Sequence, residues 1–159
     1  MRLAEHFLFR VARDVQERFV GIGDAALHVG FADVSLVGFV GQWTGTGGVC
    51  CSAQVARKIS GLMLMSDFDV VNDDVLDAMG ETTNMIIGNL KDALEPTLGR
   101  LGLSTPTVVY GEHLKARSLN GERWTTVSFD CMGGILNVKV SLRPTGEAQG
   151  HIHNHHPRT

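Results

Sequence analysis

Apolar residues recur at helical spacing along residues 73–95, which form the longest helix that the sequence predicts. At about 100° per residue, these apolar side chains gather on one side of the helix and predict a face packed against a core. The core-face positions are Leu76, Met79, Thr83, Ile86, Ile87, Leu90 and Leu94. The polar run 72–74 supplies capping residues, and Pro96 is expected to end the helix by pushing Glu95 away from helical geometry.

Two further segments show helical spacing. Residues 3–19 repeat apolar positions every three or four residues and predict a first amphipathic helix. Residues 53–65 predict another helix, whose apolar side is formed by Val55, Ile59, Leu62 and Met63.

The remaining apolar segments are typical of strands. Residues 34–41 and 47–52 predict a hairpin that turns around Thr44, Gly45, Thr46 and Gly47, and a short strand is expected near residues 106–110. A second hairpin is predicted over residues 124–131 and 135–142, with its turn at Gly133 and Gly134. Helices and hairpins in this order predict an α+β fold, in which helices pack on one face of an antiparallel sheet.

The polar side of the long helix carries an unusual row of residues. Asp77, Glu81, Asn84 and Gly88 fall within a band roughly 60° wide, opposite the core face. Asn84 and Gly88 are poorer helix formers than the Glu, Lys or Ala that a purely solvated face would use. A solvated face remains the alternative, because most exposed Glu and Asn residues do nothing chemical. The row is a candidate surface for binding a partner protein or for acting on it chemically.

Length and composition predict one domain with a tail. A chain of 159 residues is large enough for one well-covered core. Residues 144–159 are polar and lack apolar periodicity, so they are expected to be a disordered tail, which leaves residues 1–143 for the domain. The tail contains His151, His153, His155 and His156. A flexible run has no preorganised second shell, so we expect no metal site there.

Composition also disfavours several settings. Charged residues are 19% and hydrophobic ones 43%, and no apolar run approaches the roughly 20 residues that cross a bilayer. The first residues do not resemble a secretory signal, and the cysteines are an odd number, Cys50, Cys51 and Cys131, so we expect reduced thiols and a cytoplasmic protein without membrane attachment. The net charge of -3, without a dense basic cluster, argues against nucleic acid.

Acidic residues are concentrated before and within the start of the long helix. Between Asp67 and Glu81 the sequence has six acids and no base. Capping explains two or three of them, and the others place negative potential beside the polar row. The sequence therefore predicts a partner that presents Lys or Arg at this surface.

Familiar catalytic patterns are absent or weak. The glycines at 21 and 23 resemble part of a dinucleotide fingerprint, but they follow a helix and not a strand. No nucleophile elbow, phosphate-binding loop or metal-binding spacing of His and Cys occurs. An enzyme acting on small molecules through Cys50 or Cys131 lacks a general base at recognisable spacing and is the weakest alternative.

At this point the residues carry a family resemblance. The stretch Asp77-x-x-Gly80-Glu81-x-x-Asn84, followed by Met-Ile-Ile-Gly88-Asn89, resembles the signature of the CheC, CheX and FliY family of chemotaxis phosphatases, and most of all its CheX members. Residues 41–64, residues 103–111 and the final hairpin also resemble that family. The likeness covers roughly residues 3–143 and implies a CheC-like fold.

The resemblance implies a phosphatase that accelerates loss of the aspartyl phosphate of a CheY-like response regulator. The motif helix would enter the regulator's active site, where Mg²⁺ and a Lys already reside, so no cofactor of its own is expected. Asn84 would hold the attacking water, Glu81 would pair with that Lys, and Gly88 would allow close approach. Asp77 is expected to support binding.

Three further expectations accompany this hypothesis. The first helix does not repeat the Glu-x-x-Asn pattern, so one site per chain is expected, and the resemblance also suggests a homodimer. The alternative is a non-enzymatic module of the same fold that binds a receiver domain or a flagellar component. The sequence leaves open which regulator is the partner and whether the pathway is chemotaxis.

Overall fold

A computed structural model of the protein describes residues 33–111 and 124–146. The helix predicted over residues 3–19 and all but the first three residues of the predicted tail lie outside these described residues, so the proposed domain limits stay a prediction. The described elements are β1 (Asp33–Gly41), β2 (Trp43–Cys51), α2 (Ala53–Leu64), α3 (Asp73–Leu98), β3 (Leu101–Leu103), β4 (Thr107–Tyr110), β5 (Thr125–Cys131) and β6 (Gly134–Pro144).

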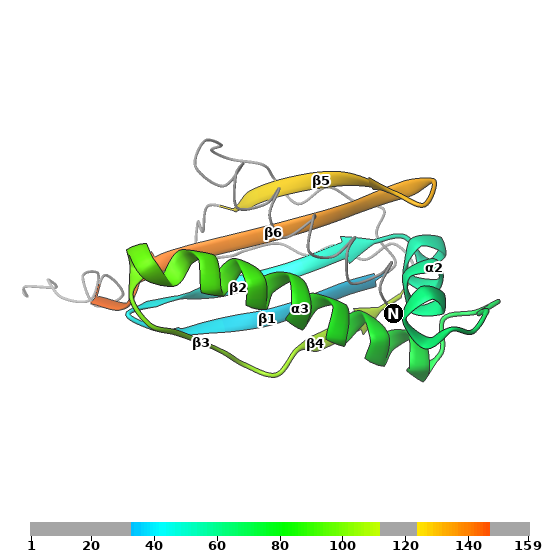
Figure 1. Ribbon diagram of the computed structural model, residues 1–159, viewed down its shortest axis with the longest axis horizontal. Helices are drawn as coiled ribbons and strands as arrows, with labels where there is room; N and C mark the ends of the chain where they lie inside the picture. Colours follow the sequence, from blue (N-terminus) through cyan, green and yellow to red (C-terminus); the bar gives the residue numbers. More distant parts are fainter. Residues whose placement is uncertain (1–32, 112–123, 147–159) are drawn as a thin grey trace, which may run out of the picture.

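The six strands form one sheet whose pairings are all antiparallel. The strand order is β3-β1-β2-β6-β5, and β4 also pairs with β1. Figure 1 shows α3 lying along the sheet, with α2 at one end. The predicted α+β fold with an antiparallel sheet is confirmed.

The first hairpin exists, but its predicted turn around Thr44, Gly45, Thr46 and Gly47 is wrong. These four residues belong to β2, and the chain turns instead at Gln42, between the two strands. The glycines of β2 serve close packing. A Cβ on Gly45 would lie 1.9 Å from the carbonyl oxygen of Ser141 in β6. Because real Cβ atoms essentially never approach so closely, this position requires glycine.

The second hairpin is confirmed, but its predicted turn at Gly133 and Gly134 is wrong by one residue, because Gly134 already belongs to β6. Cys131 pairs with Gly134, and Met132 and Gly133 form the turn with φ angles of 52° and 80°. Left-handed backbone at both central positions suits the twist of a two-residue hairpin. The short strand β3 was not predicted, and it pairs with the end of β1.

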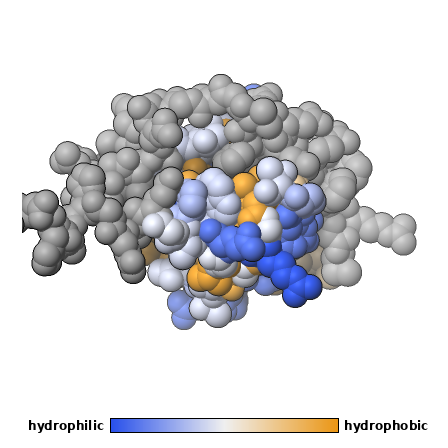
Figure 2. Space-filling view, turned by 90° about the vertical axis from the view of Figure 1, so that its left-hand side faces the viewer, coloured by the Kyte–Doolittle hydropathy of each residue, from blue (hydrophilic) through white to orange (hydrophobic). Residues whose placement is uncertain are grey.

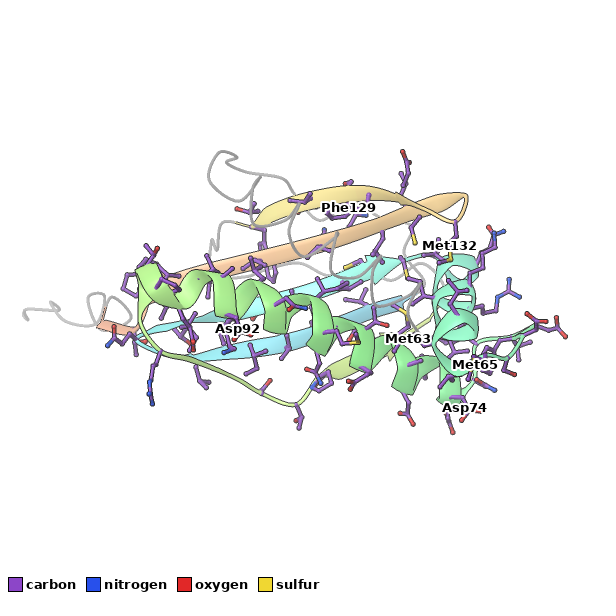
Figure 3. The ribbon with its side chains drawn as sticks, viewed as in Figure 1. Met63, Met65, Asp74, Asp92, Phe129 and Met132 are labelled. Atoms are coloured by element: carbon purple, nitrogen blue, oxygen red, sulfur yellow. The ribbon has the colours of Figure 1, made fainter. Side chains whose placement is uncertain are left out.

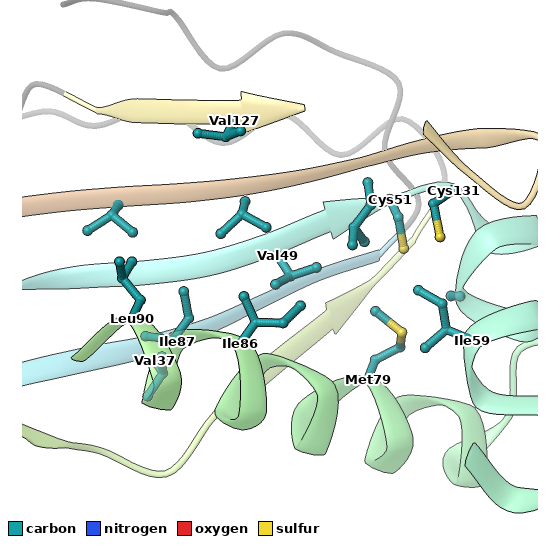
Figure 4. Close-up of a cluster of buried hydrophobic side chains, with 14 of the residues drawn as sticks. Val37, Val49, Cys51, Ile59, Met79, Ile86, Ile87, Leu90, Val127 and Cys131 are labelled. Atoms are coloured by element: carbon teal, nitrogen blue, oxygen red, sulfur yellow. The ribbon is translucent and has the colours of Figure 1, made fainter. Parts of the chain in front are cut away.

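The core lies between α3, α2 and the sheet. Figure 4 shows the side chains of Met79, Ile86, Ile87 and Leu90 on α3 facing the strands. The predicted core face of α3 is largely confirmed, although Leu76 and Leu94 are only partly buried. The helix also buries residues that were not predicted, namely Val75, Ala78, Gly80 and Thr82.

Helix α2 packs through a slightly different face from the one predicted. Val55 and Ile59 are buried as expected, and Met63 packs against the core. Leu62 is 39% exposed, so its assignment to the apolar side is wrong. Ala56 and Ser60 are buried instead. Their small side chains allow α2 to lie close to its neighbours.

The predicted end of the long helix at Pro96 is also wrong, because α3 continues to Leu98. A proline in the last turn removes only one intrahelical hydrogen bond, so the helix can pass through it. The helix ends at Gly99, whose φ of 79° departs from helical geometry and whose N–H donates to the carbonyl of Glu95 at 3.0 Å. The predicted cap at the start is confirmed, since Asn72 accepts the N–H of Val75 at 3.1 Å.

Figure 2 views the end of the molecule at which α3 terminates and the β1–β2 turn lies. Hydrophilic residues dominate the described surface there, and hydrophobic ones appear as small separate spots. Neither helix in the described part of the chain has the length and apolarity required to cross a bilayer.

Candidate functional site

The polar row on α3 is a ridge formed by Asp77, Glu81, Asn84 and Gly88, and we call it the α3 ridge. Asp77 and Glu81 are exposed, and Asn84 and Gly88 are half-buried. Figure 3 labels Asp74 and Asp92 near the two ends of the helix, and the ridge occupies the turns between them. The structure therefore brings all four predicted residues together on one side of a single helix.

The side of α3 away from the ridge is held firmly. Thr82 and Thr83 are buried, and their hydroxyls donate to the carbonyls one turn earlier, of Ala78 at 2.8 Å and Met79 at 2.9 Å. The Thr82 hydroxyl also lies 2.9 Å from the sulfur of Met63 on α2. Buried threonines in a helix need such partners, because an unpaired buried hydroxyl is costly. The side of α3 opposite the ridge is thus anchored by buried, hydrogen-bonded threonines.

The amide of Asn84 is available for contact. Among the described residues its side chain makes no hydrogen bond, whereas Asn89, one helical turn further on, donates Nδ2 to the carbonyl of Met85 at 2.7 Å. Asn89 is therefore occupied by its own helix. Glu81, three residues before Asn84, takes part in no ion pair within residues 33–111 and 124–146. A free carboxylate and a free amide stand side by side.

The segment from β3 to β4 runs along one flank of the ridge. A Cβ on Gly80 would make ordinary contacts with Val108 at 3.4 Å and Pro106 at 3.5 Å. Among the described residues, a Cβ on Gly88 would meet only Leu103, at 4.0 Å. The surface beside the ridge is therefore filled near Gly80 and open near Gly88. The position of this flank could not be predicted from the sequence, because it depends on where β3 and β4 attach to β1.

The first turns of α3 and the loop before them carry unneutralised negative charge. Asp67, Asp69, Asp73 and Asp74 are all exposed. In the described part of the chain the ion pairs are confined to Lys91, which contacts Asp92 at 2.6 Å and Glu95 at 3.3 Å. The predicted negative charge near the ridge is thus present at the surface, and a partner that presents Lys or Arg there stays a prediction.

The ion pairs at the other end of α3 affect two pKa values. The hydrogen bond from Lys91 to Asp92 is the largest cause that raises the pKa of the lysine. The pKa of Glu95 is lowered, first by the backbone N–H of Leu101 and then by Lys91. The hydrogen bond between Glu95 and Leu101 holds the end of the helix to β3, whereas the contacts of Lys91 lie within α3. They lie outside the ridge.

The cysteines do not form a competing site. Cys50, Cys51 and Cys131 are buried, and burial raises the pKa of the Cys131 thiol despite the nearby charge of Lys58. A protonated, buried thiol is a poor nucleophile. Within the residues that the structure describes, no group of three or more His, Cys, Asp and Glu side chains is placed to hold a metal ion. The histidines of the predicted tail fall outside those residues.

Comparison with known proteins identifies the family. The model of the family described as chemotaxis phosphatase CheX matches residues 34–130, which is more than half of the chain. The protein therefore belongs to the CheX family of chemotaxis phosphatases, as the resemblance of its motif predicted. None of the curated proteins matches the sequence.

Solved structures share the fold. CheX from Vibrio vulnificus is 22% identical, with a TM-score of 0.68 over 86% of this chain and 93% of that chain. CheX from Desulfovibrio desulfuricans is 24% identical, with a TM-score of 0.67 over 86% and 96%. A chain of the CheX-CheY-BeF₃-Mg²⁺ complex from Borrelia burgdorferi is 20% identical, with a TM-score of 0.66 over 86% of this chain and 95% of that chain. At these identities the likeness establishes the fold alone.

Proposed function

We propose that this protein dephosphorylates a CheY-like response regulator by inserting the α3 ridge into the regulator's active site. The observation that carries the proposal is the pair formed by Glu81 and Asn84, whose side chains are one turn apart, free of described partners and supported from behind by buried threonines. Membership of the CheX family supports the same reaction.

The chemistry needs positioning more than a protein nucleophile. In hydrolysis of an aspartyl phosphate, water oxygen forms a bond to phosphorus while the bond from phosphorus to the carboxylate oxygen breaks, and inorganic phosphate leaves. An amide cannot take a proton at neutral pH, so Asn84 acts by holding the water in line with the breaking bond. Removing the freedom of that water lowers the barrier to attack.

Glu81 and Gly88 would act on the partner and not on the phosphate. The Glu81 carboxylate would pair with the active-site Lys of the regulator and fix the approach of the amide. Open space at Gly88 would admit the partner's backbone, and Asp77 would add negative charge at the edge of the contact. Mg²⁺ is expected within the regulator, so the protein needs no cofactor of its own.

One similar structure supports the choice of partner. The Borrelia burgdorferi complex contains CheX, CheY, BeF₃ and Mg²⁺. BeF₃ bound to an aspartate mimics the phosphoryl group. The components of that complex are therefore a CheX protein and CheY together with an analogue of the group that the proposed reaction would remove. A homodimer, suggested by the family resemblance, stays a prediction.

A phosphate-release time course tests the proposal. Phosphorylated CheY-like receiver domains are incubated one at a time with the protein, and the loss of phosphate is followed. The unaltered protein should accelerate loss from at least one receiver, and Asn84→Ala should abolish that acceleration while the circular dichroism spectrum is unchanged. Asn89→Ala is the matched control, because its amide bonds to its own helix, and it should retain full activity.

The second candidate is a module that binds a receiver domain or a flagellar component without hydrolysing anything. The free amide of Asn84 disfavours it, because binding alone does not require a water-holding group on the ridge. If no receiver loses phosphate faster, yet a beryllofluoride-loaded receiver binds, the binding module replaces the phosphatase.

A further inference from the structure

A groove with a volume of about 940 Å³ runs along the outer face of α2. The helix and its C-cap residue Met65 contribute residues spaced three or four apart, Gln54, Arg57, Lys58, Gly61, Leu62 and Met65. This spacing defines one continuous helical face, opposite the buried side. The loop after α2 and Met132 of the β5–β6 turn form the other walls. Figure 3 shows Met132 and Met65 toward opposite ends of α2.

Four large apolar side chains form part of the groove lining, namely Leu62, Met65, Phe68 and Met132. Met65 is 85% exposed and Leu62 is 39% exposed, so both present apolar surface to solvent. Phe68 and Met132 are partly buried and pack against the hydrophobic core, which fixes their positions. Exposed apolar side chains around a recess offer a bound segment a surface on which its own apolar side chains can be buried.

Two cations are held along the same helix face. The guanidinium of Arg57 donates to the backbone carbonyl of Asp69, and the Lys58 ammonium donates to that of Met132 at 2.8 Å. Bonds to carbonyl oxygens orient these groups without cancelling their charge. Neither residue forms an ion pair with a carboxylate in the described part of the chain. The α2 wall is therefore cationic, while Asp67 and Asp69 line the loop wall.

The backbone at the two methionines supplies an independent observation. Met65 and Met132 both have φ of 52°, and they are the non-glycine residues with positive φ among those described. Glycine fills such positions without strain, whereas a side chain raises the energy of the left-handed conformation. Both methionines nevertheless line the groove. An unbranched thioether adapts its shape to a bound surface, which gives these side chains a use that glycine lacks.

We propose that this groove docks an acidic amphipathic segment of another protein. The apolar side of the segment would rest on Leu62, Met65 and Phe68, and its carboxylates would face Arg57 and Lys58. The lining excludes a uniformly acidic ligand, because one wall is itself acidic. This inference is independent of the α3 ridge, since none of the groove residues belongs to it.

A peptide titration tests the docking. The probe is a fluorescein-labelled peptide of about three helical turns, with Leu on one side and Glu on the other, and the control peptide has Lys in place of each Glu. The full chain should bind the Glu peptide saturably and the Lys peptide at least about tenfold more weakly. Arg57→Glu and Lys58→Glu should each weaken the Glu peptide by about tenfold, whereas Arg143→Glu, on β6, should not.

Two results of that titration would overturn the proposal. One is absence of saturable binding, or equal affinity for both peptides and equal effects of all three charge reversals. The other is self-association of the chain that Lys58→Glu abolishes in sedimentation measurements, which would identify a second copy as the occupant.

Met65 allows a second measurement, in which the melting temperature and peptide affinity should change in different directions. Met65→Gly relieves the left-handed backbone and removes a side chain that is 85% exposed, so the melting temperature should stay the same or rise. Affinity for the Glu peptide should fall several-fold, because the adaptable apolar contact is gone. Unchanged affinity, or a melting temperature that falls together with affinity, would assign Met65 to the fold and count against the groove.

Discussion

The carboxylate of Glu95 accepts the backbone N–H of Leu101 at 3.0 Å and lies 3.3 Å from the ammonium of Lys91. This pair of contacts links the last turn of α3 to the first residue of β3. It holds the helix end in place beyond Pro96, where a proline would otherwise loosen it.

We expect this link to make stability depend on pH in acid. The pKa of Glu95 is held below its ordinary value of 4.5, so its contribution is complete above pH 4.5 and is lost as pH falls through the lower, folded-state value. Glu95→Gln should lower the melting temperature at neutral pH, and the gap from the unaltered protein should close in acid. A gap that stays constant from pH 7 to pH 3 would contradict this.

Gly45 should be intolerant of any side chain. A Cβ there would lie 1.9 Å from the Ser141 carbonyl oxygen, so Gly45→Ala must push β2 and β6 apart. We expect a loss of at least about 2 kcal/mol in the free energy of unfolding, measured by urea denaturation. Gly146→Ala is the matched control, since no described atom lies within 4 Å of its added Cβ, and its effect should stay below about 0.5 kcal/mol.

Charge reversal on the ridge should weaken partner binding. Glu81→Lys places a cation where the proposed partner presents its own active-site Lys, and we expect affinity for a beryllofluoride-loaded receiver to fall by about tenfold or more. Asp130→Lys changes the net charge equally at an exposed position on β5 and should leave affinity unaltered. Equal losses from both variants would point to general electrostatics in place of a specific pair.

Substitutions of different size at Gly88 should change the phosphatase activity without preventing folding. Its added Cβ meets only Leu103 at 4.0 Å, so Gly88→Ala should fold and gain up to about 1 kcal/mol in stability from better helix propensity. Gly88→Leu should also fold, but its side chain would fill the space proposed for the partner's backbone. The rate at which the protein stimulates phosphate release from the receiver should therefore fall for Gly88→Leu and change little for Gly88→Ala. Full activity of the Leu variant would show that the partner does not approach there.

The long helix was predictable because its cause is local. Period and capping placed Met79, Ile86 and Leu90 in the core and Asn72 at the start, and all four assignments are confirmed. The burial of Val75 was missed, because sequence period describes one stripe and cannot anticipate which neighbouring elements cover its margins.

The sequence-based predictions were wrong where the role of a residue depends on contacts with residues far away in the sequence. Gly45 and Gly47 were interpreted as a turn, but Gly45 is required by Ser141, and a Cβ on Gly47 would lie 2.9 Å from Ile87. The exposed position of Glu81 followed from the helix alone, whereas Asn84, which was also predicted to be exposed, is half-buried. Their flank did not follow from the helix, because Leu103 and Pro106 reach α3 only through the pairing of β3 and β4 with β1.

The central pairing of the sheet joins parts of the chain that are made at very different times. β2 pairs with β6 from Cys51 with Leu136 to Trp43 with Pro144, so the partners are more than half of the chain apart in sequence. Such non-local pairing slows folding, since long loops must close before the contacts reward them. The ribosome must therefore release the chain through β6 before α3 can pack on the complete sheet, and until then the ridge lies on a helix without that sheet beneath it.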